Sequence, residues 1–127
     1  MIAVDTSALM AIVMREPKAA ACVEALSTDG ELLISAGTLT EALIVAAGRG
    51  VGAKMQRLIQ ALGFEIVSVT SAAAERAAEA YRAWGKGFHP AGLNFGDCFA
   101  YELARQRSCR LLYVGDDFAK TDIESAL

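Results

Sequence analysis

Four short apolar segments divide this sequence, and each interval between them is long enough to hold two helices. The segments comprise residues 2–4, 32–35, 64–69 and 111–114. Runs of this length are typical of strands, and strands with apolar side chains on both sides are buried on both faces. A strand that is followed by helices and then by another strand pairs in parallel, through a right-handed crossover. The sequence therefore predicts an α/β fold, with a central parallel sheet covered by helices on both faces.

Six helices are predicted in the intervals between these segments. Five of the expected ranges are residues 8–14, 17–26, 38–47, 71–84 and 97–107. The remaining helix, fourth along the chain, follows a loop with glycines at 48, 50 and 52 and ends at about residue 62. Thr6 and Ser7 are predicted to cap the first helix, and Ser71 is predicted to cap the fifth. The chain has no internal repeat and no composition typical of a linker, so we expect a single domain over residues 1–127.

Acidic residues are placed at the ends of the predicted strands. Asp5 ends the first strand, and Asp116 and Asp117 follow the last. Glu41 is expected in the first turn of the helix after the second strand, and Asp97 at the start of the helix before the last strand. In open α/β sheets, ligands bind at the carboxyl ends of the strands. We therefore expect these five acids to converge there as a candidate catalytic site.

Two of these acids have apolar helical neighbours. The residues three and four positions after Glu41 and Asp97 are apolar or aromatic, and no lysine or arginine shares either stripe in its first two turns. A buried carboxylate is costly unless it is paired or binds a cation. Carboxylates without neighbouring cysteine or histidine ligands favour Mg²⁺, with Mn²⁺ as a substitute. The pattern therefore predicts a Mg²⁺ site at this edge of the sheet.

Hydroxyl and amide side chains accompany the acids and are expected to orient them. Thr6 and Ser7 directly follow the acid of the first strand, and Asn94 precedes Asp97 by three residues. His89 is the only histidine and lies in a predicted loop. It is interpreted as a packing or surface residue rather than as a general base.

Three segments resemble a known family of nucleases. Residues 2–8 read IAVDTSA, which resembles the start of PIN-domain nucleases. Residues 91–99 read AGLNFGDCF, which is similar to a motif of the VapC toxins within that family. Residues 111–118 read LLYVGDDF, followed by KTDI at 120–123, and this ending is similar to the same subgroup. Glu41 lies where the family carries a helical glutamate, and the resemblance covers nearly the whole chain.

The resemblance implies a three-layer PIN-like fold with a central parallel sheet of four or five strands, in which any fifth edge strand is short or missing here. It implies a Mg²⁺-dependent endoribonuclease that is the toxin of a type II toxin–antitoxin pair. By the same resemblance, Asp5 and Asp97 are the main metal ligands, and Glu41 and Asp117 complete the acidic cluster. Asp116 stands at a position that varies in the family, so it stays open which of the two adjacent acids belongs to the site.

RNA, an antitoxin protein and a second copy of the chain are the expected partners. Arg49, Lys54 and Lys86 are candidate contacts to RNA phosphates. The apolar residues of the first and fourth predicted helices, including Met10 and Met55, are candidates for an exposed patch. A net charge of −3 is unusual for a nucleic-acid-binding chain. Five of the fifteen acids are assigned to the metal site, however, so this charge does not exclude an RNA substrate.

Alternatives to this interpretation are a catalytically inactive PIN-fold module that binds RNA or protein, a receiver-like domain, and a phosphatase of the haloacid dehalogenase type. A receiver-like domain is disfavoured because the first strand carries Asp5 alone. The phosphatase is disfavoured because Ser7 stands where its second acid is needed. The three cysteines lack a metal-binding spacing, and the sequence shows neither a signal peptide nor a membrane-spanning segment. We therefore expect a cytoplasmic protein with no membrane association.

Overall fold

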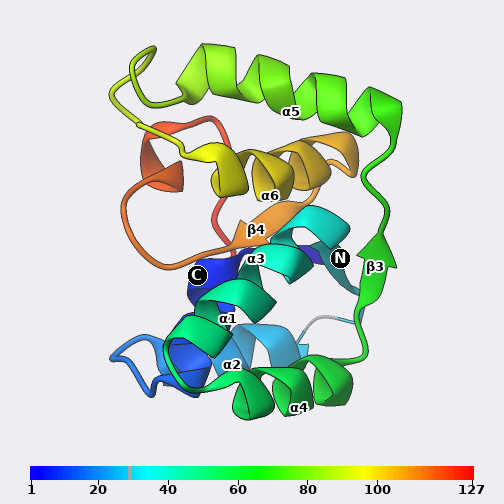
Figure 1. Ribbon diagram of the computed structural model, residues 1–127, viewed down its shortest axis with the longest axis vertical. Coiled ribbons are helices and arrows are strands. Elements are labelled where there is room, and N and C mark those ends of the chain that lie inside the picture. Colours follow the sequence, from blue (N-terminus) through cyan, green and yellow to red (C-terminus); the bar gives the residue numbers. More distant parts are fainter. Residues whose placement is uncertain (29) are drawn as a thin grey trace.

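Four parallel strands form the centre of the molecule (Figure 1). The computed structural model describes residues 1–28 and 30–127. The strands are β1 (Ile2–Val4), β2 (Leu32–Ser35), β3 (Glu65–Val67) and β4 (Arg110–Leu112). They lie in the order β3-β2-β1-β4, and each neighbouring pair is parallel. The predicted parallel sheet is confirmed, with β1 and β2 at its centre.

Six α-helices in the described residues surround this sheet. They are α1 (Thr6–Val13), α2 (Ala19–Thr28), α3 (Ala36–Gly48), α4 (Gly52–Leu62), α5 (Ser71–Trp84) and α6 (Phe95–Gln106), and the 3₁₀ helix η1 (Phe118–Lys120) follows β4. Helices α5 and α6 form one layer and α1, α2 and α4 the other, while α3 contacts helices of both (Figure 1). Within the described residues, no helix has the length and apolar composition that crossing a membrane requires.

Alternating strand residues point into two separate cores. Ile2 and Val4 of β1 pack with α1 to α4, whereas Ala3 packs with α5 and α6. On β4, Leu111 and Leu112 divide between the two cores in the same way. All five residues are essentially inaccessible to solvent. The two-residue period of the strands therefore supplies both faces of the sheet with apolar side chains, which produces the three-layer α/β fold.

The caps of two helices differ from the prediction. Helix α1 is capped by Asp5, whose carboxylate accepts a hydrogen bond from the N–H of Ser7 at 3.0 Å. Helix α5 is capped by Thr70, whose hydroxyl accepts from the N–H of the third helical residue at 3.1 Å. The assignments of Thr6 and Ser7 to the first cap and of Ser71 to the fifth were wrong. Adjacent residues of equal capping ability are separated by backbone conformation, which the sequence does not specify.

The C-terminal residues add a minimal fifth element beside β4. The N–H of Leu111 donates to the carbonyl of Glu124 at 3.0 Å, and the N–H of Ala126 donates to the carbonyl of Leu111 at 3.0 Å. Together they form an isolated parallel bridge between Leu111 and Ser125. This agrees with the expectation that any fifth edge strand is short. Strand β3 is also shorter than predicted, because it lies at the other edge and pairs with β2 alone.

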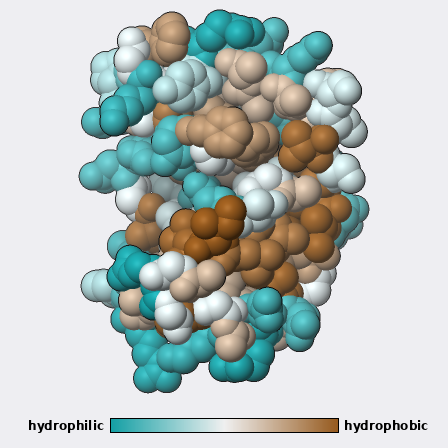
Figure 2. All heavy atoms as spheres, in the orientation of Figure 1, coloured by the Kyte–Doolittle hydropathy of each residue, from teal (hydrophilic) through white to brown (hydrophobic). Residues whose placement is uncertain are grey.

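Part of the apolar surface lies elsewhere than predicted. Met10 and Met55 are 8% and 0% exposed and belong to the core, because α1, α3 and α4 pack against one another. Ile44 and Val45 on α3 are exposed instead. Figure 2 shows hydrophobic side chains gathered across the middle of this face, over α3.

Candidate active site

Asp5 is buried where β1 passes into α1. It is 3% exposed, and its Oδ2 accepts hydrogen bonds from the N–H and the hydroxyl of Ser7 at 3.0 and 2.6 Å. The Ser7 hydroxyl also accepts from the N–H of Val114 at 3.0 Å, which joins α1 to the segment after β4. The other oxygen of Asp5, Oδ1, is buried without a hydrogen-bond partner. Such an atom is costly, and it is available as a ligand for a cation.

Glu41 lies between the starts of α1 and α6, although it comes from α3. The hydroxyl of Thr6 donates to its Oε1 at 2.7 Å, and a Cβ atom at Gly96 would overlap its carboxylate. Sequence reasoning missed Gly96. The signal that could have identified it is a glycine at the start of a helix, because the lack of a Cβ atom lets another side chain approach the backbone closely. Because α3 begins earlier than predicted, Glu41 lies in its second turn rather than its first. The prediction that Glu41 lies on a core-facing stripe was also wrong, because Ile44 and Val45, the apolar residues of that stripe, are exposed.

Asp97 is fixed by a capping box at the start of α6. Its N–H donates to Oδ1 of Asn94 at 2.9 Å, and the N–H of Asn94 donates to its Oδ2 at 3.0 Å. Asp97 is 7% exposed, and the residues that follow it on the same stripe, Ala100 and Tyr101, are buried as expected. It occupies the third helical position rather than the first, because α6 begins at Phe95.

Burial and mutual repulsion raise the pKa values of the two buried acids. Burial, with a contribution from the charge of Glu41, raises the pKa of Asp5 to about 6, although hydrogen bonds from Ser7 oppose the shift. Burial raises the pKa of Asp97 to about 7. The charges that add to this second shift come from the other acids, Asp5, Asp117 and Glu41. These four carboxyl groups therefore lie within electrostatic range of one another.

Asp117 and Asp116 differ in their relation to this cluster. Both follow β4 and are exposed. Asp117 directly precedes η1, and its charge helps to raise the pKa of Asp97. Asp116 is not among the principal charges that act on Asp5 or Asp97. Of the five acids singled out in the sequence, four thus interact electrostatically, and Asp116 is not among the main charges that act on the buried pair.

The chemistry of this donor set fits a hard divalent cation. The available donors are carboxylate oxygens, which Mg²⁺ and Mn²⁺ prefer, and Oδ1 of Asp5 has no other partner. In the described part of the chain, no three acidic, histidine or cysteine side chains already lie in an arrangement that could hold a metal ion. Glu41 instead accepts a hydrogen bond from the hydroxyl of Thr6.

The three predicted RNA contacts are dispersed. Arg49 follows α3 and Lys54 lies in the first turn of α4, and both are exposed. Arg49 is eight residues beyond Glu41, which is about 12 Å along a helix axis. Lys86 is different, because it lines a cavity that Asn94 also lines.

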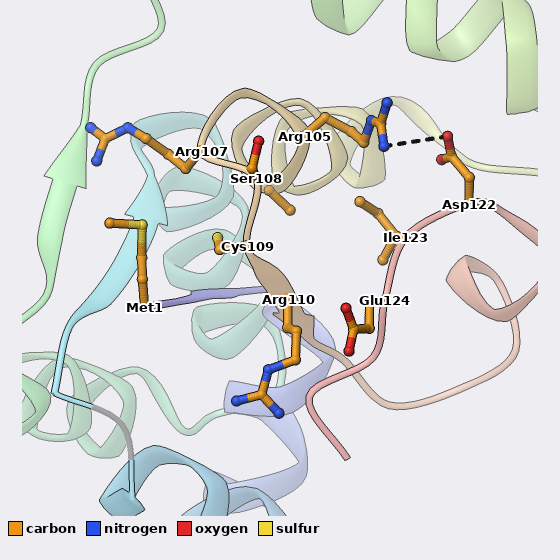
Figure 3. Close-up of a pocket in the computed structure, with 10 residues that line it drawn as sticks. Met1, Arg105, Arg107, Ser108, Cys109, Arg110, Asp122, Ile123 and Glu124 are labelled. Carbon is orange, nitrogen blue, oxygen red and sulfur yellow. Dashed lines mark ion pairs between the residues drawn. The ribbon is translucent and has the colours of Figure 1, made fainter.

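A second cavity, of about 770 Å³, lies at the opposite edge of the sheet (Figure 3). Arg110, at the start of β4, lines it together with Arg105 and Arg107. Arg105 pairs with Asp122 at 3.6 Å, as the dashed line in Figure 3 marks, and Arg107 pairs with Glu65 at 3.1 Å. The amino ends of the strands therefore carry a group of arginines with structural partners, away from the acids at the carboxyl ends.

Comparison with known proteins identifies this arrangement. The sequence matches the PIN domain over residues 2–124. It is 40% identical over 123 residues to Ribonuclease VapC30 of Mycobacterium tuberculosis, with 94% of each chain covered. The fold is similar to that of Mycobacterium tuberculosis VapC20, a Sarcin-Ricin loop cleaving toxin, with a TM-score of 0.79 at 16% identity over 97% of this chain and 96% of that one. A toxin–antitoxin complex from Klebsiella pneumoniae gives a TM-score of 0.71 at 21% identity over 96% and 93%. The chain therefore belongs to the PIN-domain family, and within it to the VapC ribonucleases.

Proposed function

We propose that this chain is a Mg²⁺-dependent endoribonuclease and the toxin of a type II toxin–antitoxin pair. The observation that carries the proposal is the convergence of Asp5, Glu41, Asp97 and Asp117 from four separate segments. Among the described residues, the main charges that act on the two buried acids are those of other carboxylates. Such a cluster is unfavourable by itself and becomes favourable when it binds a cation.

Asp5 and Asp97 are the proposed main ligands of Mg²⁺, and Glu41 and Asp117 complete the set. A divalent cation held there supplies neutralisation of phosphate charge and acidity for the attacking water. Mn²⁺ is expected to replace Mg²⁺, because it accepts the same oxygen ligands.

Three neighbouring side chains position the proposed ligands. Ser7 holds one oxygen of Asp5 and leaves the other free, and Thr6 holds Glu41. Asn94 holds Asp97 through both bonds of the capping box. Fixing the carboxylates in this way reduces the reorganisation that substrate binding would otherwise require.

The proposed reaction is hydrolysis rather than attack by the ribose 2′-hydroxyl. Water attacks phosphorus in line, the bond to the ribose 3′ oxygen breaks, and the products carry a 5′-phosphate and a 3′-hydroxyl. This route needs no histidine pair. The single histidine, His89, has structural contacts: its Nδ1 accepts from the N–H of Ala91 at 3.0 Å, and its ring packs edge-on against Trp84 at 4.7 Å.

A cognate antitoxin is the proposed regulator. The similarity in fold to the toxin–antitoxin complex from Klebsiella pneumoniae supports a protein partner of this kind. An arginine of such a partner would pair favourably with the acid cluster, because bidentate contacts between arginine and carboxylate are strong.

A homodimer is also part of the proposal. Light scattering after size-exclusion chromatography measures the molar mass and so tests for the dimer.

The decisive experiment is RNA cleavage by the purified chain with Mg²⁺, Mn²⁺ or EDTA. Asp5→Asn and Asp97→Asn should abolish cleavage and keep the circular dichroism spectrum of the wild type. Glu24→Gln, an exposed acid on α2, is the matched control and should cleave normally. Sequencing of the RNA ends should show 5′-phosphates.

Asp117→Asn and Asp116→Asn test the choice between the adjacent acids, and the first should be the more damaging. Full activity of a folded Asp97→Asn protein would refute the assignment of the site. RNA binding without cleavage by the wild type would favour the inactive binding module instead.

A further inference from the structure

Two buried side-chain atoms lack a hydrogen-bond partner in the part of the chain that the structure describes. They are Oδ1 of Asp5 and the hydroxyl oxygen of Thr38. Asp5 is 3% exposed and Thr38 is 0% exposed. Buried polar atoms without partners are rare, because each loses its hydration and gains nothing in return. The proposed metal site accounts for the Asp5 oxygen, but the acids by themselves leave the Thr38 hydroxyl unexplained.

Thr38 lies where α3 begins, beside the acid cluster. Helix α3 lies between α6 and α1 (Figure 1), and Thr38 is its third residue. The carbonyl of Thr38 contacts the hydroxyl of Thr6, the residue next to Asp5, at 3.4 Å. The same Thr6 hydroxyl donates to Oε1 of Glu41 at 2.7 Å. Thr38 therefore touches the one residue that connects these two acids.

The side chain of Thr38 shares a face of α3 with Glu41. Residues three and four apart on a helix point to the same side, so Thr38, Glu41 and Ala42 form one stripe. Ala42 is 0% exposed, and the Glu41 carboxylate lies against Gly96 of α6. The Thr38 hydroxyl is thus buried on the side of α3 that brings Glu41 to the cluster.

A hydroxyl in this position complements a hydrated divalent cation. Mg²⁺ retains several water molecules when it binds to a protein through one or two carboxylates. Those waters need acceptors, and a threonine oxygen has two lone pairs to offer. Hydrogen bonds beyond the direct ligands orient a metal site and strengthen its affinity. A hydrated cation in the cluster would therefore satisfy both unpartnered atoms, Oδ1 of Asp5 directly and the Thr38 hydroxyl through water.

We propose that Thr38 is a positioning residue of the acid cluster, whose hydroxyl accepts a hydrogen bond from the hydration water of a divalent cation bound at Oδ1 of Asp5. The inference rests on the proposed metal-dependent function. It differs from the roles of Thr6, Ser7 and Asn94, which contact the carboxylates themselves. The Thr38 hydroxyl finds its partner only with the cation, so it contributes to cation binding and not to the stability of the metal-free fold.

Mn²⁺ binding to the whole chain, measured by electron paramagnetic resonance of the free ion, tests the proposal without RNA. Thr38→Val keeps the size and shape of the side chain and removes the hydroxyl. It should weaken Mn²⁺ binding by about 10- to 100-fold, the usual effect of losing a hydrogen bond beyond the direct ligands. Thr38→Ser keeps the hydroxyl and should bind Mn²⁺ as the wild type does.

Thr40→Val is the matched control for Thr38→Val. Thr40 is an exposed threonine of the same helix, and its hydroxyl donates to the carbonyl of Ala36 at 2.9 Å. This control should bind Mn²⁺ with the affinity of the wild type. Thr38→Ala and Thr38→Ser form a second pair that differs only in the hydroxyl, and they decide the outcome if Thr38→Val does not fold. The alanine variant should bind Mn²⁺ about 10- to 100-fold more weakly than the serine variant.

Thermal unfolding in EDTA separates the proposed role from simple core packing. Removing a buried hydroxyl that lacks a partner should leave the melting temperature of metal-free Thr38→Val equal to that of the wild type or higher. A packing defect would lower the melting temperature and the Mn²⁺ affinity together. Unchanged Mn²⁺ affinity of Thr38→Val overturns the proposal, as do equal affinities of the serine and alanine variants or a lower melting temperature of metal-free Thr38→Val.

Mn²⁺ binding by Asp5→Asn and RNA cleavage in Mg²⁺ are measured in parallel, so that the two proposals fail separately. If the wild type cleaves RNA and Asp5→Asn loses Mn²⁺ while Thr38→Val retains it, the role of Thr38 is excluded and the proposed function stands. Absence of Mn²⁺ binding by the wild type also excludes the role of Thr38. Absence of both Mn²⁺ binding and cleavage overturns the proposed function as well.

Discussion

Replacing Asp97 by asparagine should stabilise the metal-free protein while it removes a proposed ligand. At about pH 8 the carboxylate is largely ionised, although it is buried beside three other acids. A pKa raised from 3.8 to about 7 disfavours the ionised folded state by roughly 4 kcal/mol, at about 1.4 kcal/mol per unit. Asparagine is neutral and similar in shape, and its oxygen can still accept from the N–H of Asn94. We therefore expect the free energy of unfolding to rise by about 2–4 kcal/mol.

The pH dependence of this gain identifies its cause. Between pH 3.8 and about 7 the folded state binds more protons at Asp97 than the unfolded state does, so the stability of the wild type falls as the pH rises through this window. Below 3.8 the carboxyl group is protonated in both states and the penalty disappears. The stabilisation by Asp97→Asn should therefore be largest above about pH 7 and close to zero near pH 4.

Urea unfolding in EDTA, followed by the fluorescence of Trp84, measures the effect at several pH values across this window. Asp116→Asn is the matched control, because it removes an exposed acid that is not among the principal charges on Asp5 or Asp97, and it should show no comparable pH-dependent gain. The reasoning is wrong if Asp97→Asn destabilises the protein at high pH. It is also wrong if Asp97→Asn raises the free energy of unfolding equally at both ends of the pH window. A pH-independent gain would come from better capping of α6 and not from the removal of a buried charge.

Three further predictions concern the same site. Mg²⁺ or Mn²⁺ should raise the melting temperature of the wild type in scanning calorimetry by mass action, and an equal rise in Asp5→Asn would exclude this site. Gly96→Ala should displace the Glu41 carboxylate and reduce cleavage. The control Gly48→Ala has open space at its Cβ position, and it should leave cleavage unchanged and be neutral or stabilise α3 by up to about 1 kcal/mol. Equal activity of the two variants would contradict the close approach of the Glu41 carboxylate to Gly96. Thr6→Val should lower the cleavage rate with little change in RNA affinity, because it removes the 2.7 Å hydrogen bond that holds Glu41, and normal rates would show that this bond is dispensable.

Local patterns in the sequence were sufficient for the fold class and for the placement of the main acids. The strands could be recognised because they are short, apolar and separated by long helical intervals. Parallel strands bring their carboxyl ends to one edge, so Asp5 and Asp117 were expected near each other from chain direction alone. The buried position of Asp97 followed from the apolar residues of its own helix, which do face the core.

The same kind of reasoning was wrong for Glu41. Its stripe on α3 is as apolar as that of Asp97, but α3 contacts both helical layers and leaves Ile44 and Val45 exposed. A stripe indicates burial only if another element covers it, and the helix itself does not contain that information. Glu41 reaches the acid cluster through contacts with Thr6 and Gly96, which belong to other helices.

The sequence by itself determined that this chain forms a parallel α/β sheet with carboxylates at one edge, because strand length, polarity and order along the chain are local properties. Only the tertiary structure placed the charge of Asp117 among the main ones that act on Asp97. It alone showed that Oδ1 of Asp5 and the hydroxyl of Thr38 are buried without a partner. These features depend on distances between segments far apart in the sequence, and such distances are set when the layers pack.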